Sequence, residues 1–292
     1  MSTAASALSA PRGPLRALVR AFHANKTSWV GLVLLLAILL AAACAPWLAS
    51  HDPIAQDITA QLQGPSARHW LGTDEYGRDT WSRLLYGARA SLAIGAAATA
   101  LALLIGAAIG ILAGWIGGRF DAWVMQTMDV LLAFPALILG LIVVAMMGPS
   151  MVNIVIAIAL TSIPPFARIA RAPTLALRGR EFIEACKALG FSDARTVGLH
   201  VVPNLAAEVL VMTSLWMANA IRTEASLAFI GLGVKPPTPT WGGMIRSGFE
   251  NILDSGWLAV VPSVAILLVI FALNLLGDGL RDAVDPKLKN EV

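Results

Sequence analysis

Residues 29–48 read WVGLVLLLAILLAAACAPWL, and this apolar run decides the class of fold that the chain adopts. An α-helix rises about 1.5 Å per residue, so about 20 apolar residues cross the roughly 30 Å hydrocarbon core of a lipid bilayer. A Trp residue lies near each end of the run, at Trp29 and Trp47, and Trp side chains collect where a membrane meets water. The run therefore predicts a helix that spans a membrane.

The composition of the whole chain also indicates a membrane protein. Of its 292 residues, 57% are hydrophobic and only 13% are charged, whereas soluble domains carry about 25% charged residues. The chain is basic, with a pI of about 9.1. Its Lys and Arg residues are spread over the predicted loops rather than gathered on one face, so we expect no nucleic-acid partner. Cys44 and Cys186 stand in unlike surroundings and are not expected to form a disulfide.

Five further apolar stretches are candidates for membrane-spanning helices. They cover residues 90–113, 122–146, 152–167, 205–230 and 257–277. The fourth span is expected to end at Pro164-Pro165, because Pro interrupts a helix. The fifth span contains four polar residues, namely Glu208, Asn219, Arg222 and Glu224. The sequence thus predicts an all-α, polytopic membrane protein with six transmembrane helices.

The distribution of positive charge predicts how these helices are oriented. If both termini are cytoplasmic, 14 of the 21 Lys and Arg residues lie on the inner side, and positive residues resist translocation. We therefore expect an N-in, C-in topology. The expected organisation is a cytoplasmic tail at 1–28, the first transmembrane helix at 29–48, an extracytoplasmic loop at 49–89, a five-helix core at 90–280 with a cytoplasmic loop at 168–204, and a cytoplasmic tail at 281–292.

A processing site near the N-terminus is the alternative to a retained first helix. The sequence AAAC at 41–44 weakly resembles a lipoprotein site, and residues 43–45 weakly resemble an A-x-A cleavage site. The apolar run before them is as long as a full span, and Pro46 follows directly. We expect the helix to be retained.

The cytoplasmic loop contains a semi-polar stretch, EACKALGFSDARTVGLHVVPN, at 184–204. Its first apolar residues recur at helical spacing: Phe182, Ala185, Cys186 and Leu189. Gly190 is the expected left-handed stop, and Ser192 is placed to cap a second helix. The pattern predicts a helix, a Gly corner and a second helix, called here the elbow. Spacing alone leaves an ordinary amphipathic connector equally open.

Residues 79–89 predict a helix in the plane of the membrane interface, within the extracytoplasmic loop. Asp79 is placed to cap it, and its apolar side chains fall on one face: Trp81, Leu84, Leu85 and Ala88. Arg83 and Arg89 are expected to point away from that face. This helix is either a passive lid or a contact for a solute-binding protein.

A second outer loop follows the fifth span. Gly231 and Gly233 are expected to break the helix, and KPPTPT at 235–240 favours an extended backbone. The loop either frames the mouth of a pore or simply separates two spans.

Polar residues within spans normally face a cavity or another helix. Gln126 and Asp129 share one face of the third span, which Pro135 can bend. Asp129 either lines a translocation path or pairs with Arg119. Asn153 and Asn219, like Thr213 and Ser214, either line the same path or join helices. The candidate path residues are Gln126, Asp129, Asn153 and Asn219.

Gly106 and Gly110 form a G-x-x-x-G pattern in the second span. Small residues at this spacing let two helices approach closely. The pattern therefore predicts close packing, with a partner helix either in this chain or in another subunit.

Four stretches carry a resemblance to a known family. Glu184-Ala185-Cys186, Gly190 and the later HVVPN are similar to the E-A-A loop of ABC importer permeases. The stretches LGTDEYGRDTWSRLLYGARASL at 71–92, EASLAFIGLGVKPPTPTWGGMI at 224–245 and NLLGDGLRDAVDPK at 274–287 resemble the C-type permease subunit of dipeptide, oligopeptide and nickel importers. Cys186 departs from the family pattern, which has a second Ala there.

The resemblance implies the type I permease fold and a coupling helix that docks on a cytoplasmic ATPase. The implied coupling residues are Glu184, Ala185, Cys186, Lys187, Leu189 and Gly190. The carboxylate of Glu184 either contacts the partner or caps the elbow. The implied partners are a homologous second permease, two ABC ATPase subunits or domains, an extracytoplasmic solute-binding protein and the lipid bilayer of a bacterial inner membrane.

The resemblance further implies import of di- and oligopeptides, with nickel chelates or glutathione as alternative cargo. The chain has no G-x-x-x-x-G-K-[ST] motif, so ATP and Mg²⁺ would be bound by the partner ATPase. We expect no cofactor and no metal site in this chain.

Two other function classes compete with this interpretation. An enzyme is disfavoured, because none of the four His residues lies in H-E-x-x-H and no G-x-S-x-G occurs. A channel or secondary transporter that works without ATP usually shows strong intramembrane charges or internal repeats, and the sequence displays neither clearly.

Overall fold

The computed structural model describes residues 26–284, and their regular elements are helices. The longer helices are α2 (Lys26–Ala43), α4 (Thr80–Ile116), α5 (Gly118–Ala133), α6 (Ala136–Met147), α7 (Met151–Arg178), α10 (Val202–Leu227) and α13 (Trp257–Val284). The shorter ones are α3 (Ala45–Leu48), a 3-10 turn (Ile58–Ala60), α8 (Glu181–Ala188), α9 (Asp193–Thr196), π-helical turns (Val197–Val201 and Ala228–Leu232), α11 (Trp241–Glu250) and α12 (Ile252–Ser255). The all-α prediction is confirmed. The predicted tails lie almost entirely outside the described residues.

The helices that are long and apolar enough to cross a membrane match the predicted spans. Among the described residues these are Thr80–Ile116, Met151–Arg178, Asp193–Leu232 and Trp257–Asp282. Helices α5 and α6 pass the same test only together, with a bend of 89° between them, so the described residues contain four such spans, or five if this pair counts as one, against the six predicted. Helix α2 is a shorter apolar helix at the position of the first predicted span.

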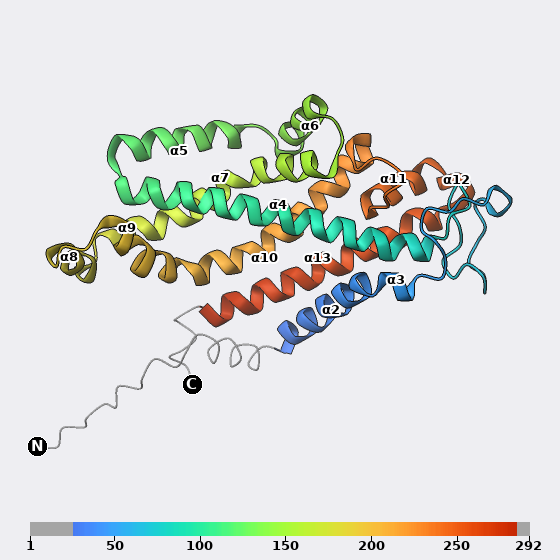
Figure 1. Ribbon diagram of the computed structural model, residues 1–292, viewed down its shortest axis with the longest axis horizontal. Helices are drawn as coiled ribbons and strands as arrows, with labels where there is room; N and C mark the ends of the chain where they lie inside the picture. Colours follow the sequence, from blue (N-terminus) through green and yellow to red (C-terminus); the bar gives the residue numbers. More distant parts are fainter. Residues whose placement is uncertain (1–25, 285–292) are drawn as a thin grey trace, which may run out of the picture.

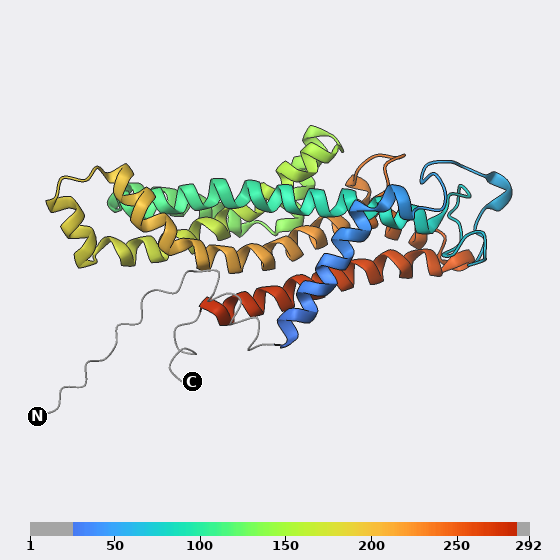
Figure 2. The ribbon, with the colours of Figure 1, turned by 60° about the horizontal axis from the view of Figure 1, so that its bottom comes forward.

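The two ends of the helical bundle carry different structures. Helices α8 and α9 lie at one end, and α11, α12 and the loop at 49–79 lie at the other (Figures 1 and 2). The end formed by residues 179–201 is called the coupling end below. The end formed by residues 49–79 and 233–256 is called the loop end. Helix α5 runs along α7 on one side, and α6 turns away from the bundle (Figure 1).

Glycines of α4 allow a close contact with another helix in the core. A Cβ atom added to Gly106 would lie 2.6 Å from the carbonyl oxygen of Ile163, and one added to Gly110 would collide with the Ala167 carbonyl. The G-x-x-x-G pattern therefore brings two backbones together, as predicted. Its partner is α7 of the same chain.

Helix α7 continues through Pro164 and Pro165, so the prediction that the fourth span ends there was wrong. The helix also contains Pro173 and runs to Arg178. A Pro within a membrane helix is tolerated when neighbouring helices support the interrupted turn. Here Phe166 is buried against the glycine side of α4, so tertiary packing outweighs the local preference to stop. The predicted loop at 168–204 consequently begins as helix.

The predicted interfacial helix is part of α4 rather than a separate element. Asp79 caps it as expected, since its side chain accepts a hydrogen bond from Ser82 N at 2.8 Å. No helix breaker follows, so α4 continues for 37 residues, or about 55 Å at 1.5 Å per residue. Arg83 was predicted to point away from the packed face. It is instead buried, and its Nε lies 3.2 Å from Asp74 Oδ2.

Candidate functional site

The elbow at the coupling end has the predicted helix–Gly–helix form. Helix α8 ends at Ala188, and Gly190 takes φ 77°. The N–H of Phe191 donates to Cys186 O, and the N–H of Gly190 donates to Lys187 O, both at 3.0 Å. This is a Schellman motif, which satisfies the free carbonyls at a helix end and needs a left-handed residue. Gly190 is therefore fixed by backbone conformation, because no atom lies within 4 Å of a Cβ placed there.

One side of α8 is anchored in the bundle. Ile183 is fully buried and packs in a cluster with Trp115 of α4 and with Val201 and Leu205 at the start of α10. Cys186 is 8% exposed on the same side. The ammonium of Lys187 lies 5.3 Å from the centroid of the Trp115 ring, a favourable cation–π distance. The anchor connects the elbow to two long helices at once.

The opposite side of α8 faces outward and mixes apolar with acidic side chains. Phe182 is 43% and Leu189 is 74% exposed, and Glu181, Glu184 and Ala185 are exposed beside them. Of the predicted coupling residues, only Cys186 is buried and belongs to the anchor instead. An exposed helix face of this kind suits insertion into a groove of another protein.

The second limb of the elbow runs directly into α10. Ser192 caps α9, and its Oγ accepts a hydrogen bond from Arg195 N at 3.4 Å. A π-helical turn at Val197–Val201 then continues into α10 without a loop. On the other side, α7 ends at Arg178, close to the start of α8 at Glu181. A displacement of α8 is therefore passed to α7 and α10 through short connections.

The two candidate path residues on α5 are exposed. Gln126 and Asp129 both face outward. Asp129 Oδ1 accepts a bond from Arg168 Nη2 of α7 at 2.5 Å. The predicted alternative partner, Arg119, was therefore wrong, because the packing of α5 along α7 brings Arg168 to this position.

The two candidate asparagines have local hydrogen-bond partners. Asn153 Nδ2 donates to Met147 O at 2.8 Å and to Gly148 O at 2.9 Å, so it closes the turn after α6. Asn219 Oδ1 accepts from Arg222 Nη2 at 2.5 Å. The four candidate path residues thus lie on α5, α7 and α10, and three of them bond to partners outside the candidate set.

Two buried polar groups lie outside the set of candidate path residues. Glu224 of α10 is fully buried and accepts a hydrogen bond from Ser91 Oγ of α4 at 3.3 Å. Asp121 of α5 binds Arg171 of α7 through both carboxylate oxygens. The signal for Glu224 was its position within an apolar span, but its partner is 133 residues distant in sequence.

The loop end is built on a charged network around the start of α4. Arg78 Nε lies 2.7 Å from Asp74 Oδ2, and Arg83 reaches the same oxygen. Burial alone would raise the pKa of Asp79, but hydrogen bonds from Ser82 and His69 outweigh it and hold that pKa below its usual value. Asp79 is therefore a carboxylate at neutral pH.

Comparison with known proteins places this architecture in a family. Residues 106–290 match the family of binding-protein-dependent transport system inner membrane components, and residues 13–65 match the N-terminal transmembrane domain of oligopeptide transport permease C. A dipeptide transport system permease of Alkalihalophilus pseudofirmus is 40% identical over 95% of this chain and 91% of its own length. A di/tripeptide permease of Pseudomonas aeruginosa is 42% identical over 95% and 93%. A glutathione permease of Pectobacterium atrosepticum is 40% identical over 96% and 93%.

Among solved structures, the methionine ABC transporter MetNI in an inward-facing conformation resembles this chain. The TM-score is 0.57 with 16% sequence identity, over 69% of this chain and 96% of that one. At this identity the likeness concerns the fold, and it confirms the predicted type I permease fold. The chain therefore belongs to the binding-protein-dependent transport system inner membrane components, as a C-type permease of the dipeptide and oligopeptide branch.

Proposed function

We propose that this chain is one of two permease subunits of an ATP-driven importer, and that it carries di- and oligopeptides by alternating access. The observation that carries the proposal is the elbow, which presents an exposed apolar and acidic face on a buried anchor. The exposed face of this helix is free to bind a partner, and the buried face would carry a movement of the partner into the bundle.

The partner at the coupling end is a cytoplasmic ABC ATPase, with two such subunits or domains in the complex. The chain has no phosphate-binding P-loop of its own, so the energy of ATP hydrolysis must enter through a contact. Closure of the ATPases displaces α8, and the short connections to α7 and α10 tilt both helices. Coupling requires that each ATPase state binds one conformation of the spans more tightly.

The remaining partners follow from the orientation. The excess of Lys and Arg on the inner side favours cytoplasmic termini, which places the coupling end in the cytoplasm and the loop end outside. A solute-binding protein then delivers cargo at the loop end. A homologous permease completes the path on the side of the α5–α6 arm, where many apolar side chains are exposed.

Peptides are the favoured cargo because two of the relatives named above are peptide permeases of near-equal length. Glutathione is the second candidate, since a relative at 40% identity carries that name, and glutathione is itself a small peptide. Nickel chelates remain a third candidate. The three candidate cargoes are distinguished by measuring which of them the cognate solute-binding protein binds, with a panel of peptides, glutathione and nickel chelates.

The test of coupling is uptake into membrane vesicles that contain the whole complex. Glu184→Lys reverses a charge on the docking face, and Gly190→Pro cannot adopt φ 77° or donate the hydrogen bond to Lys187 O. We expect both variants to lower ATP-driven uptake more than about 10-fold, since a disrupted interface charge costs about 2–5 kcal/mol. Insertion into the membrane should remain normal.

Two further variants make this test specific. Cys186→Ala lies on the anchored side of the same helix and is expected to keep uptake. Glu184→Gln separates the two roles of the carboxylate. The neutral amide removes the charge but can still accept a hydrogen bond. Uptake should therefore fall if the charge contacts the partner, and should persist if the side chain only caps the elbow. Normal uptake by both Glu184→Lys and Gly190→Pro would contradict the coupling role of the elbow. Uptake without ATP or the ATPase would favour a channel or secondary transporter.

A further inference from the structure

Three side chains that can ligate a metal ion converge at the loop end. His51 follows α3, His69 lies in the loop before α4, and Asp79 is the N-cap of α4. One ligand atom from each lies within 4.8 Å of the others. No metal site was expected from the sequence, since none of the four His residues lies in H-E-x-x-H.

Both imidazole rings bring Nδ1 near the same carboxylate oxygen. Nδ1 of His69 lies 2.9 Å from Asp79 Oδ1, whereas Nδ1 of His51 lies 3.7 Å from that atom and 3.0 Å from Ser50 Oγ, its hydrogen-bond partner. The two ring centroids are 4.6 Å apart. In a tetrahedral zinc site, where bonds are about 2.0–2.2 Å long, neighbouring ligand atoms are about 3.3 Å apart. Small rotations, chiefly of the half-exposed His51, therefore bring all three atoms onto one ion.

The other carboxylate oxygen of Asp79 is occupied by hydrogen bonds, which fixes the orientation of Oδ1. Oδ2 accepts bonds from Ser82 N at 2.8 Å, Ser82 Oγ at 2.7 Å and Ser50 Oγ at 3.2 Å. Asp79 and His69 are both buried. Hydrogen bonds to ligating residues hold them in place and raise metal affinity, so two of the three ligands are preorganised.

The backbone on either side of the histidines is also held. His51 N donates to Ser82 Oγ at 3.1 Å, and Arg83 Nη1 donates to Pro53 O at 3.0 Å. His69 N donates to Ser66 Oγ at 3.0 Å within a tight turn. The cluster is therefore tied to α4 through several independent contacts.

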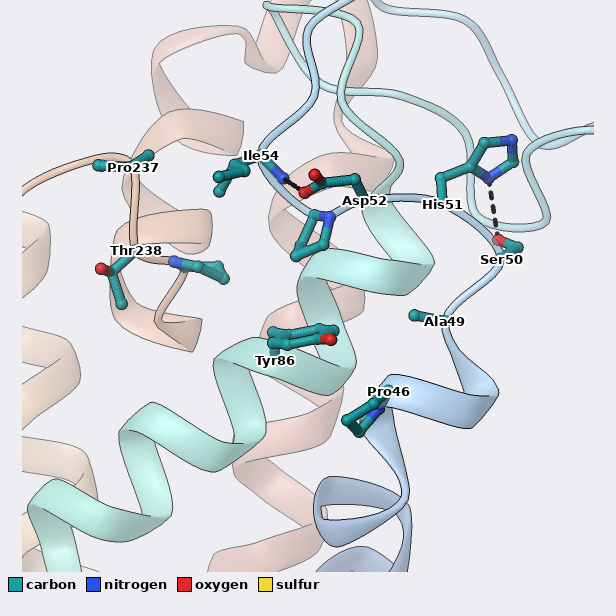
Figure 3. Close-up of a pocket in the computed structure, with 11 residues that line it drawn as sticks. Pro46, Ala49, Ser50, His51, Asp52, Ile54, Tyr86, Pro237 and Thr238 are labelled. Atoms are coloured by element: carbon teal, nitrogen blue, oxygen red, sulfur yellow. Dashed lines mark hydrogen bonds between the residues drawn. The ribbon is translucent and has the colours of Figure 1, made fainter.

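The cluster borders a cleft of about 720 Å³, which Ser50 and His51 line together with Tyr86 of α4 and the segment Pro237–Pro239. The ring of His51 points away from Tyr86 and Pro237 and lies beside Ser50 (Figure 3). Its side chain is 34% exposed, so an ion and a fourth ligand can reach it from solvent. Catalytic and exchangeable zinc sites have this form, with three protein ligands and one open position.

We propose that His51, His69 and Asp79 bind one divalent transition-metal ion, with Zn²⁺ as the best match, and that water occupies its fourth position. Two imidazole nitrogens and one carboxylate oxygen are ligands that Zn²⁺ accepts readily. A purely structural His69–Asp79 hydrogen bond would explain the position of His69 but not the presence of the His51 ring near the same carboxylate oxygen. The bound ion would connect the chain after α3, the loop before α4 and α4 itself.

The test is metal binding by the full chain in lipid nanodiscs, purified with a tag that contains no histidine and stripped with a chelator. Co²⁺ alone is titrated first, because its visible absorption reports coordination geometry, and Zn²⁺ alone then displaces it. We expect one equivalent per chain. His51→Ala should lower the affinity at least about 100-fold, since loss of a ligand exceeds the 10–100-fold effect of losing a supporting hydrogen bond. Ser50→Ala should lower it about 10-fold.

The matched control is His200→Ala, which removes a histidine at the coupling end and should leave the affinity unchanged. His51 is half-exposed, so His51→Ala should keep the metal-free unfolding temperature and lose only the rise that Zn²⁺ gives to the wild-type chain. Asp79→Asn provides a second ligand variant. The proposal is overturned if the wild-type chain binds no equivalent of either ion, or if His51→Ala and His200→Ala bind equally well.

Discussion

At the scale of single residues, Glu224 joins three helices of the core. Its Oε2 accepts from Ser91 Oγ of α4, and Ser91 Oγ accepts from Trp241 N of α11 at 3.1 Å. The indole N–H of Trp241 donates to Leu84 O at 3.0 Å. Oε1 of Glu224 has no hydrogen-bond partner among the described residues. A buried carboxyl that is only partly satisfied is costly, so the hydrogen bond from Ser91 offsets part of that cost.

This network predicts that two substitutions of Glu224 differ in their effect on stability. Glu224→Gln keeps the shape and the acceptor but cannot carry a charge, so the apparent unfolding temperature in detergent should stay within a few degrees of wild type or rise. Glu224→Ala leaves a cavity and an unpaired Ser91, and should cost about 2–4 kcal/mol. Equal unfolding temperatures for the two variants would show that the network contributes no stability.

Single residues also show how much of the elbow could be predicted from the sequence alone. Gly190 and Ser192 follow local rules for helix ends, and both take the expected roles. Which face of α8 is exposed was not predictable in the same way. Phe182 and Ile183 are adjacent and both apolar, but only packing in the cluster with Trp115 and Val201 decides that Ile183 is buried and Phe182 is not.

At the scale of elements, the contact between α4 and α7 holds the core together. Gly106, Gly110 and Gly114 lie one turn apart along α4, and each faces the backbone or a short side chain of α7. The same contact supports α7 through its prolines. Sequence predicted close packing at the first two glycines, but a pattern of small residues does not identify its partner.

A matched pair of Gly→Ala variants tests this contact. A Cβ at Gly110 collides with the Ala167 backbone, whereas one at Gly140 of α6 meets its nearest atom, in Leu227, at 3.6 Å. Gly110→Ala should destabilise the fold by about 1–3 kcal/mol through overpacking. Gly140→Ala should be neutral or stabilise by up to about 1 kcal/mol, because Ala favours helix. Thermal unfolding in detergent measures both, and a loss no greater for Gly110→Ala than for Gly140→Ala would contradict this account.

At the scale of the whole molecule, the separation of the coupling end from the loop end is the feature that function needs. The bundle places α8 at one end and the loop at 49–79 at the other (Figure 1). A motor contact and a delivery contact can then act on the same helices from opposite sides of a membrane. Helices α4 and α10 reach toward both ends (Figure 1).

The orientation of these ends is tested by labelling single cysteines with a membrane-impermeant maleimide. Leu253 is 98% exposed near the loop end and Leu189 is 74% exposed at the coupling end. In a Cys44→Ser, Cys186→Ser background, Leu253→Cys should react from outside the cell membrane. Leu189→Cys should react only after permeabilisation, when the chain is expressed without its partners. Reaction of both from the same side, or a reversed pattern, would contradict the proposed orientation.

The sequence by itself determined the helical class, the approximate positions of the apolar helices, the Gly corner and the caps at Asp79 and Ser192. These features depend on hydrophobic length and on backbone preferences within a few residues. Only the tertiary structure decided that α7 passes through Pro164 and Pro165, that Arg83 is buried, and that Asp129 pairs with Arg168. It also decided that His51, His69 and Asp79 meet. Each of these outcomes depends on contacts between residues distant in sequence, whose energies outweigh the local preferences that a sequence displays.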